Sequence, residues 1–130
     1  MSINIEKPMK ISFDEVEFDE HVPSIKFIFI ANIEQFSNSL SYSGEIWISC
    51  LIWDNFVNDL VTLKKTATLY DMNEMFSIKI EKDEKNIKYS WSVTRQGIFK
   101  DIVQSSYQTI ISEDTLNYVK SQFTNYPKWW

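Results

Sequence analysis

The chain has 130 residues, of which 44% are hydrophobic and 24% charged, and its net charge is −5. This length and composition are typical of one globular domain, which we expect to span residues 1–130. The acidic balance argues against a nucleic-acid-binding protein, which needs a basic surface, and two glycines are too few for a glycine-rich phosphate loop.

The first strand signal changes face part-way along. Met9, Ile11 and Phe13 are apolar at odd positions, whereas Val16 and Phe18 are apolar at even positions. A single regular strand cannot move its apolar side chains from one face to the other without an extra residue. The pattern therefore predicts a bulge or turn between Phe13 and Val16.

Two further strands and a helix follow. Residues 24–34 are apolar on both faces, which is typical of a central strand, and residues 40–49 predict the next one. After Ser49 the apolar residues take helical spacing, at Ile52, Trp53, Phe56, Val57 and Leu60. We expect a helix over about 49–62, with the Ser49 side chain accepting a hydrogen bond from its first turn.

The second half of the chain alternates cleanly. Residues 66–70 predict a short strand, and residues 76–81 and 87–95 predict two strands with one apolar and one solvent-exposed face, as antiparallel sheets have. Residues 98–111 predict a longer, more polar strand. Ser112, followed by two acids, predicts the start of a second helix over about 113–126. The expected fold is α+β, a mostly antiparallel curved sheet with the two helices packed on it.

The tryptophans have two interpretations. Trp47, Trp53 and Trp91 fall on the predicted core faces of their elements, so we expect them to be buried. Trp129 and Trp130 end the chain. They either fold back to seal one end of the core, which we favour because exposed tryptophan lowers solubility, or offer anchors to a partner.

Residues able to carry out chemistry are sparse. His21 is the only histidine and Cys50 the only cysteine. One of each cannot form the usual zinc ligand set. An exposed loop histidine and a buried, unreactive cysteine are the preferred interpretations. We predict no catalytic residues, no metal site and no cofactor, and hence a protein that is not an enzyme.

Five acids cluster around the predicted bulge, at Asp14, Glu15, Glu17, Asp19 and Glu20. Charged residues on an edge strand prevent unwanted sheet pairing, which is one interpretation. The other is an acidic surface that attracts a basic protein partner. The sequence leaves both open.

Part of the chain is similar to a known family. Residues 43–49 (Ser-Gly-Glu-Ile-Trp-Ile-Ser), residues 53–60 (Trp-Asp-Asn-Phe-Val-Asn-Asp-Leu), residues 67–71 and 76–80, and the strand over 89–93 resemble small bacterial proteins known as WapI-type immunity proteins. The resemblance covers roughly residues 40–93, and its motifs are structural. It implies a protein that needs no cofactor, catalyses no reaction and protects its cell by binding a cognate toxin in the cytoplasm. It supplies no individual site residues.

The first functional hypothesis is therefore an immunity-type protein that neutralises a toxin through its surface. The alternatives are a small-ligand-binding domain with an aromatic-lined cavity and another kind of protein-interaction module. A cytoplasmic location is expected, since a single cysteine suits a reducing compartment and the N-terminus lacks a basic and apolar leader. No membrane association is expected, because the apolar runs fall far short of the roughly 20 residues of a membrane span.

Overall fold

A computed structural model describes all residues, 1–130, and has two four-stranded antiparallel sheets and two helices. The first sheet contains β1 (Ser2–Ile5), β2 (Lys10–Asp19), β3 (Ser24–Gln35) and β4 (Asn38–Ser49), in that order. The second contains β5 (Thr66–Tyr70), β6 (Phe76–Lys82), β7 (Ile87–Gln96) and β8 (Ile102–Ile111). The helices are α1 (Cys50–Thr62), which joins the sheets, and α2 (Glu113–Thr124). The α+β class and both helices are confirmed.

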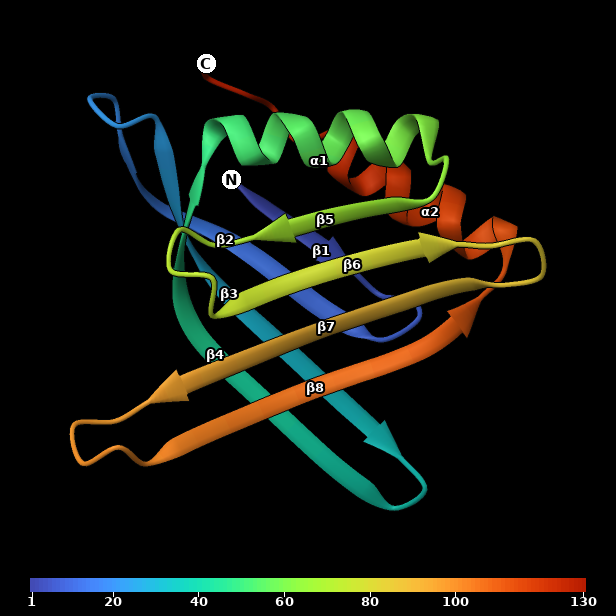
Figure 1. Cartoon of the computed structure of the whole chain (residues 1–130), viewed down its shortest axis with the longest axis horizontal. Coiled ribbons are helices and arrows are strands. Elements are labelled where there is room, and N and C mark those ends of the chain that lie inside the picture. The colour runs from blue at the N-terminus through green and yellow to red at the C-terminus, as the bar shows by residue number, and fades with distance from the viewer.

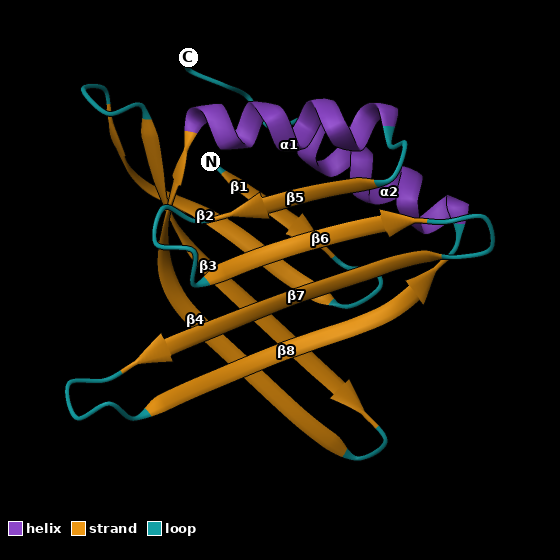
Figure 2. Ribbon diagram, viewed as in Figure 1, coloured by secondary structure: helices purple, strands orange, loops and turns teal.

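The two sheets face each other with their strands crossing (Figure 1). Within each sheet every strand pairs with its neighbour in sequence, so both sheets are simple antiparallel meanders. Helix α1 runs alongside β5, and α2 lies behind it at the same end of the molecule (Figure 2). The helices thus close one end of the space between the sheets.

The predicted bulge is confirmed in β2. The pairing of β2 with β3 shifts between Glu15 and Glu17, which leaves Val16 as the extra residue. After the shift Phe18 lies opposite Ile25, on the same side of the sheet as the core residues that precede the bulge. The bulge therefore reconciles the odd and even apolar positions.

Both helices begin at the predicted serines. Ser49 Oγ accepts a hydrogen bond from the Ile52 N–H at 3.0 Å, and Ser112 Oγ accepts one from the Thr115 N–H at 3.1 Å. Each bond satisfies one of the free N–H groups of a first helical turn. The local sequence therefore determines where each helix starts.

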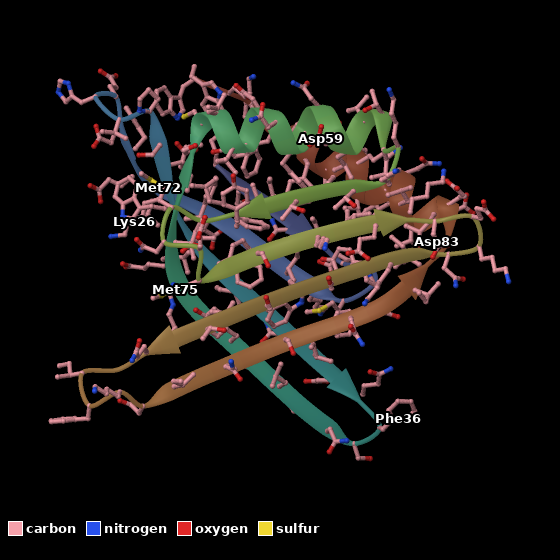
Figure 3. The ribbon with its side chains drawn as sticks, in the orientation of Figure 1. Lys26, Phe36, Asp59, Met72, Met75 and Asp83 are labelled. Carbon is pink, nitrogen blue, oxygen red and sulfur yellow. The ribbon has the colours of Figure 1, made fainter.

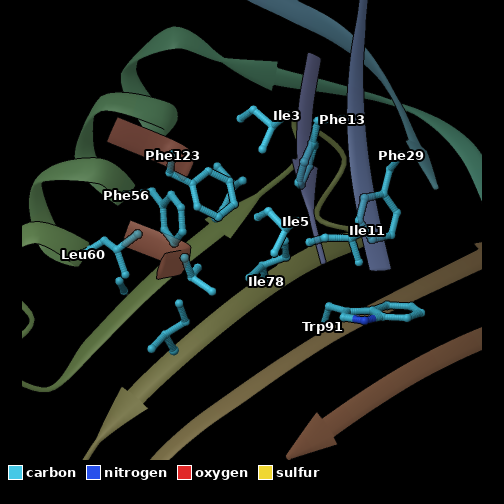
Figure 4. Packing of buried hydrophobic residues seen from close by; sticks show 14 of the residues in the cluster. Ile3, Ile5, Ile11, Phe13, Phe29, Phe56, Leu60, Ile78, Trp91 and Phe123 are labelled. Carbon is cyan, nitrogen blue, oxygen red and sulfur yellow. The ribbon is translucent and has the colours of Figure 1, made fainter. Parts of the chain in front are cut away.

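One continuous core fills the space between the sheets and the helices. It consists of 30 buried apolar residues. Figure 4 shows Phe123 beside Phe56 near the helices, and Phe13, Phe29 and Trp91 on the other side of the core. The ring of Phe13 lies 5.2 Å from that of Phe29 and 5.9 Å from that of Phe123, measured between centroids. These are the spacings of favourable aromatic pairs, so aromatic packing joins β2, β3 and α2.

Two expectations were wrong. Trp53 and Trp91 are buried, but Trp47 is half-buried on the outer face of β4, because Ile46 and Ile48 take the inward positions. Residues 98–101 are not part of β8. The Gly97 N–H donates to the Asp101 carbonyl at 2.7 Å and closes a loop there. The apolar side chains at positions 98 and 99 had instead indicated the start of a strand.

Strand β1 was missed altogether. It has four residues, and only Ile3 and Ile5 alternate inward. So short a signal is not distinguishable from a terminal segment by periodicity alone. Its position follows from its pairing with β2, in which Ile5 lies opposite Ile11.

Candidate functional site: an acidic and aromatic hairpin

The hairpin of β2 and β3 extends past the ends of the second sheet (Figure 1). Its exposed apolar side chains are Val16, Phe18 and Val22, each about half accessible to solvent. Phe18 lies on the inner side of its sheet, opposite Ile25, and yet its side chain is exposed there. The inner side of the hairpin tip is therefore left to the C-terminal tail.

That tail folds back, as expected. The ring centroid of Trp129 lies 4.7 Å from that of Phe18, and Trp130 Nε1 donates to both carboxylate oxygens of Asp54, at 3.1 and 3.0 Å. Lys128 Nζ reaches the same carboxylate at 2.8 Å. Because Asp54 belongs to α1, the tail is fixed to the helix on one side and to the hairpin on the other. Even so, 49% of Phe18 and 38% of Trp129 remain exposed.

The five acids of the sequence cluster divide into two groups. Two of them have structural partners: the Glu15 carboxylate accepts a hydrogen bond from the Tyr126 hydroxyl, and Asp19 Oδ1 accepts the His21 N–H at 2.8 Å. The Glu15 bond is a second tie between the C-terminal segment and β2, and the Asp19 bond shapes the turn of the hairpin. These acids have roles that the sequence did not reveal.

The other three acids are free or loosely paired. Asp14 and Glu20 make no side-chain hydrogen bond or ion pair, and Glu17 has only a 3.9 Å contact with Lys26 while its side chain stays 58% exposed. An ion pair of this length and exposure adds little stability. The acids able to meet a partner are thus Asp14, Glu17 and Glu20.

We use the name hairpin surface for a set of six side chains. They gather around the tip of the β2–β3 hairpin: Phe18 and Trp129 in contact on the inner side, Glu17 opposite Lys26 on the outer side, and Val16, Val22 and Glu20 exposed at the bulge and the turn. Sequence reasoning identified the acids and considered Trp129, but it missed Phe18. The available signal was an aromatic residue between two acids at the end of a strand, which core packing explains equally well.

Burial controls the ionisation of the groups beneath this surface. Burial and the hydrogen bond to Glu15 both raise the pKa of Tyr126, so its hydroxyl remains a donor at all ordinary pH values. The pKa of Cys50 is also raised, first by burial and then by the Asp54 carboxylate. A helix N-terminus lowers a thiol pKa, but here these two effects are stronger, and the thiol is buried.

His21 lies on the exposed turn of the same hairpin. Its imidazole makes no hydrogen bond to Cys50 or to a carboxylate, although the Cys50 N–H donates to the nearby Pro23 carbonyl at 2.8 Å. A general base needs a partner within hydrogen-bonding reach. Nowhere in the chain do three His, Cys, Asp or Glu side chains group closely enough to hold a metal ion.

Two hollows lie elsewhere. One, at the open end between the sheets, has a volume of about 450 Å³ and is lined by residues that include Glu6, Lys10 and Tyr107. The other is shallower, has a volume of about 810 Å³ and lies along residues 63–66 and 81–88, with a mainly charged lining. The aromatic side chains that a ligand cavity under α1 would require, Trp53 and Phe56, are instead packed in the core.

No protein-family model, curated protein or solved structure matches the chain. Neither of its helices has the length and apolar character needed to cross a bilayer.

Proposed function

We propose that this protein is a non-enzymatic, immunity-type protein that binds a cognate toxin through the hairpin surface and thereby neutralises it. The observation that carries the proposal is the exposed contact of Phe18 with Trp129 at the tip of a hairpin that also bears the free acids Glu17 and Glu20. Binding energy in protein interfaces concentrates in a few aromatic anchors surrounded by polar side chains. The resemblance of residues 40–93 to immunity proteins supplies the kind of partner.

The acids indicate the charge of that partner. Glu17 and Glu20 project from a chain whose net charge is −5, so the surface attracts a basic protein. A toxin that cleaves nucleic acid has a basic active site, because it must bind phosphates. Opposite charges on the two surfaces speed the encounter and orient it.

The first test measures affinity for the proposed toxin partner, which we expect a neighbouring gene to encode. Truncation of an aromatic anchor costs about 2 kcal/mol or more, so Phe18→Ala and Trp129→Ala should each raise the Kd by at least about 30-fold. Phe36→Ala is the matched control, because Phe36 is an exposed aromatic at the opposite end of the molecule (Figure 3). Equal affinity of all three variants and the wild type would refute the proposed surface.

The second test separates local charge from net charge. Glu20→Lys should slow association with the toxin and weaken its dependence on salt, since long-range attraction acts mainly on the association rate. Glu84→Lys changes net charge equally but lies in the β6–β7 loop, beside the Asp83 labelled in Figure 3. If both variants slow association equally, the acids of the hairpin have no special role.

The third test concerns neutralisation. Co-expression of the wild-type protein should restore growth to cells that produce the toxin, and the Phe18→Ala, Trp129→Ala double variant should not. Circular dichroism of the purified variant establishes that it is folded. Failure of the wild type to protect, despite tight binding, would count against the immunity function while leaving the surface intact.

A further inference from the structure

Strand β8 is an edge strand without the usual protection. It has ten residues, Ile102–Ile111, none of them charged and none of them proline, and its pairing with β7 is regular along its whole length. Natural edge strands are normally short, charged, bulged or covered, because open N–H and C=O groups pair readily with another strand. The outer edge of β8 has none of these features.

The other edge strands of the two sheets are covered, short or partly hydrogen-bonded to other segments. Helix α1 lies alongside β5, and β1 has four residues and lies near α2. On β4, the Trp47 carbonyl accepts the Met72 N–H at 2.8 Å and the Glu45 carbonyl accepts Arg95 Nη2 at 2.6 Å. Only residues 38–44 of β4 are similarly open, and Leu40 is the one large exposed aliphatic side chain among them.

We propose that β8 pairs with β8 of a second copy of this chain, in antiparallel orientation, to form one continuous eight-stranded sheet. The inference is independent of the proposed function. It rests on the order of apolar and polar residues along β8, which is nearly the same from either end. Apolar residues stand at both ends of the strand and polar residues between them. Such a strand is complementary to itself under a two-fold axis.

The register follows from the geometry of antiparallel pairs. Residues directly opposite each other point to the same face of a sheet, and the outward positions of β8 are the even ones, opposite the solvent-facing residues of β7. With the axis at Ser106, Ile102 lies opposite Ile110 of the second copy and Gln104 opposite Gln108. The Ile pairs bring together side chains that are 63% and 56% exposed in one copy.

The inner face supports the same register. Ser105 Oγ is buried and has no hydrogen-bond partner within the chain. With the axis at Ser106 it lies beside Tyr107 of the second copy, and the new strand also supplies backbone groups next to it. A buried hydroxyl without a partner is costly, so a contact that provides one is favoured.

The pairing leaves the hairpin surface free. Strand β8 and strand β5 are the opposite edges of the second sheet, and α1, to which the C-terminal tail is fixed, lies beside β5. The dimer would therefore present two hairpin surfaces, one on each copy.

Cysteine cross-linking of the full chain tests the register. In an antiparallel pair opposite Cα atoms are about 4.5–5.5 Å apart, within the range of a disulfide. Ser106→Cys should therefore oxidise to a covalent dimer of twice 15.4 kDa. Ser92→Cys is the matched control: it lies next to Ser106 on the same face but one strand inward, and it should remain monomeric on a denaturing gel. Native Cys50 is buried in both variants.

Sedimentation measures the association itself. The wild type should shift from monomer to dimer with rising concentration, and Ser106→Lys should raise the dimer Kd about two- to fivefold, because it places two like charges opposite each other. Ser92→Lys should leave the Kd unchanged. A wild type that stays monomeric up to its solubility limit, or equal cross-linking of the two cysteine variants, would overturn the proposal.

Discussion

At the scale of single residues, a few polar side chains fix the loops of this protein. Asp71 is the clearest case, since it is buried and its Oδ1 accepts the N–H groups of Met75 at 2.8 Å and Phe76 at 3.1 Å. Aspartate and asparagine are turn formers, so the residues between β5 and β6 have the composition of a turn. That composition did not indicate burial, which depends on how β5 and β6 pack against the rest of the chain.

We expect Asp71→Ala to lower the free energy of unfolding by about 1–3 kcal/mol, because it leaves two N–H groups without their acceptor. Asp71→Asn keeps an acceptor oxygen in the same place and should retain most of the stability. Urea unfolding of the three proteins measures the difference. A loss as large for asparagine as for alanine would show that the negative charge, and not the acceptor, is what matters.

Asp83 gives a prediction for pH. Its carboxylate accepts the N–H groups of Asn86 at 2.7 Å and Lys85 at 2.8 Å, and these bonds lower its pKa below the ordinary 3.8. A lowered pKa in the folded state means that the carboxylate stabilises the fold fully above pH 3.8 and loses this effect as the pH falls through the lower, folded value.

The difference in unfolding free energy between wild type and Asp83→Ala should therefore be constant near neutral pH and shrink in acid. Chemical unfolding at a series of pH values measures it. A difference that grows as the pH falls would contradict the assignment.

At the scale of elements, local patterns were informative wherever the stabilising contacts are also local. The two serine caps, the bulge of β2 and the alternation in β6 and β7 all follow from neighbouring residues. The errors have a different origin. Trp47 faces outward because two isoleucines beside it occupy the inner positions, and residues 98–101 form a loop through backbone hydrogen bonds that side-chain hydrophobicity does not report.

The Ser49 cap gives a prediction at this scale. Ser49→Ala should destabilise the protein by about 1 kcal/mol, because it removes the acceptor for the Ile52 N–H at the start of α1. Ser49→Asp restores an acceptor and should be close to the wild type. Thermal unfolding compares them. If alanine is tolerated without loss, α1 is held by its packing alone.

At the scale of the whole molecule, the division of the strands into two crossing sheets was not predictable from the sequence. Each strand has an apolar face that fits either a single curved sheet or two facing sheets, and only long-range pairing distinguishes them. Only part of the candidate site was predictable, again because some of its contacts are long-range. The acids were visible locally, whereas the contact of Phe18 with Trp129 joins residues at opposite ends of the chain.

The interior of this domain is filled by its 30-residue apolar core, so we propose that the protein acts through its outer surface. Hydrogen–deuterium exchange of this protein, alone and mixed with the proposed toxin partner, tests that claim most directly. We predict that binding protects the β2–β3 hairpin, residues 16–22, and the C-terminal tail, residues 128–130. Protection confined to the cleft around Glu6, Lys10 and Tyr107, with the hairpin unchanged, would contradict it.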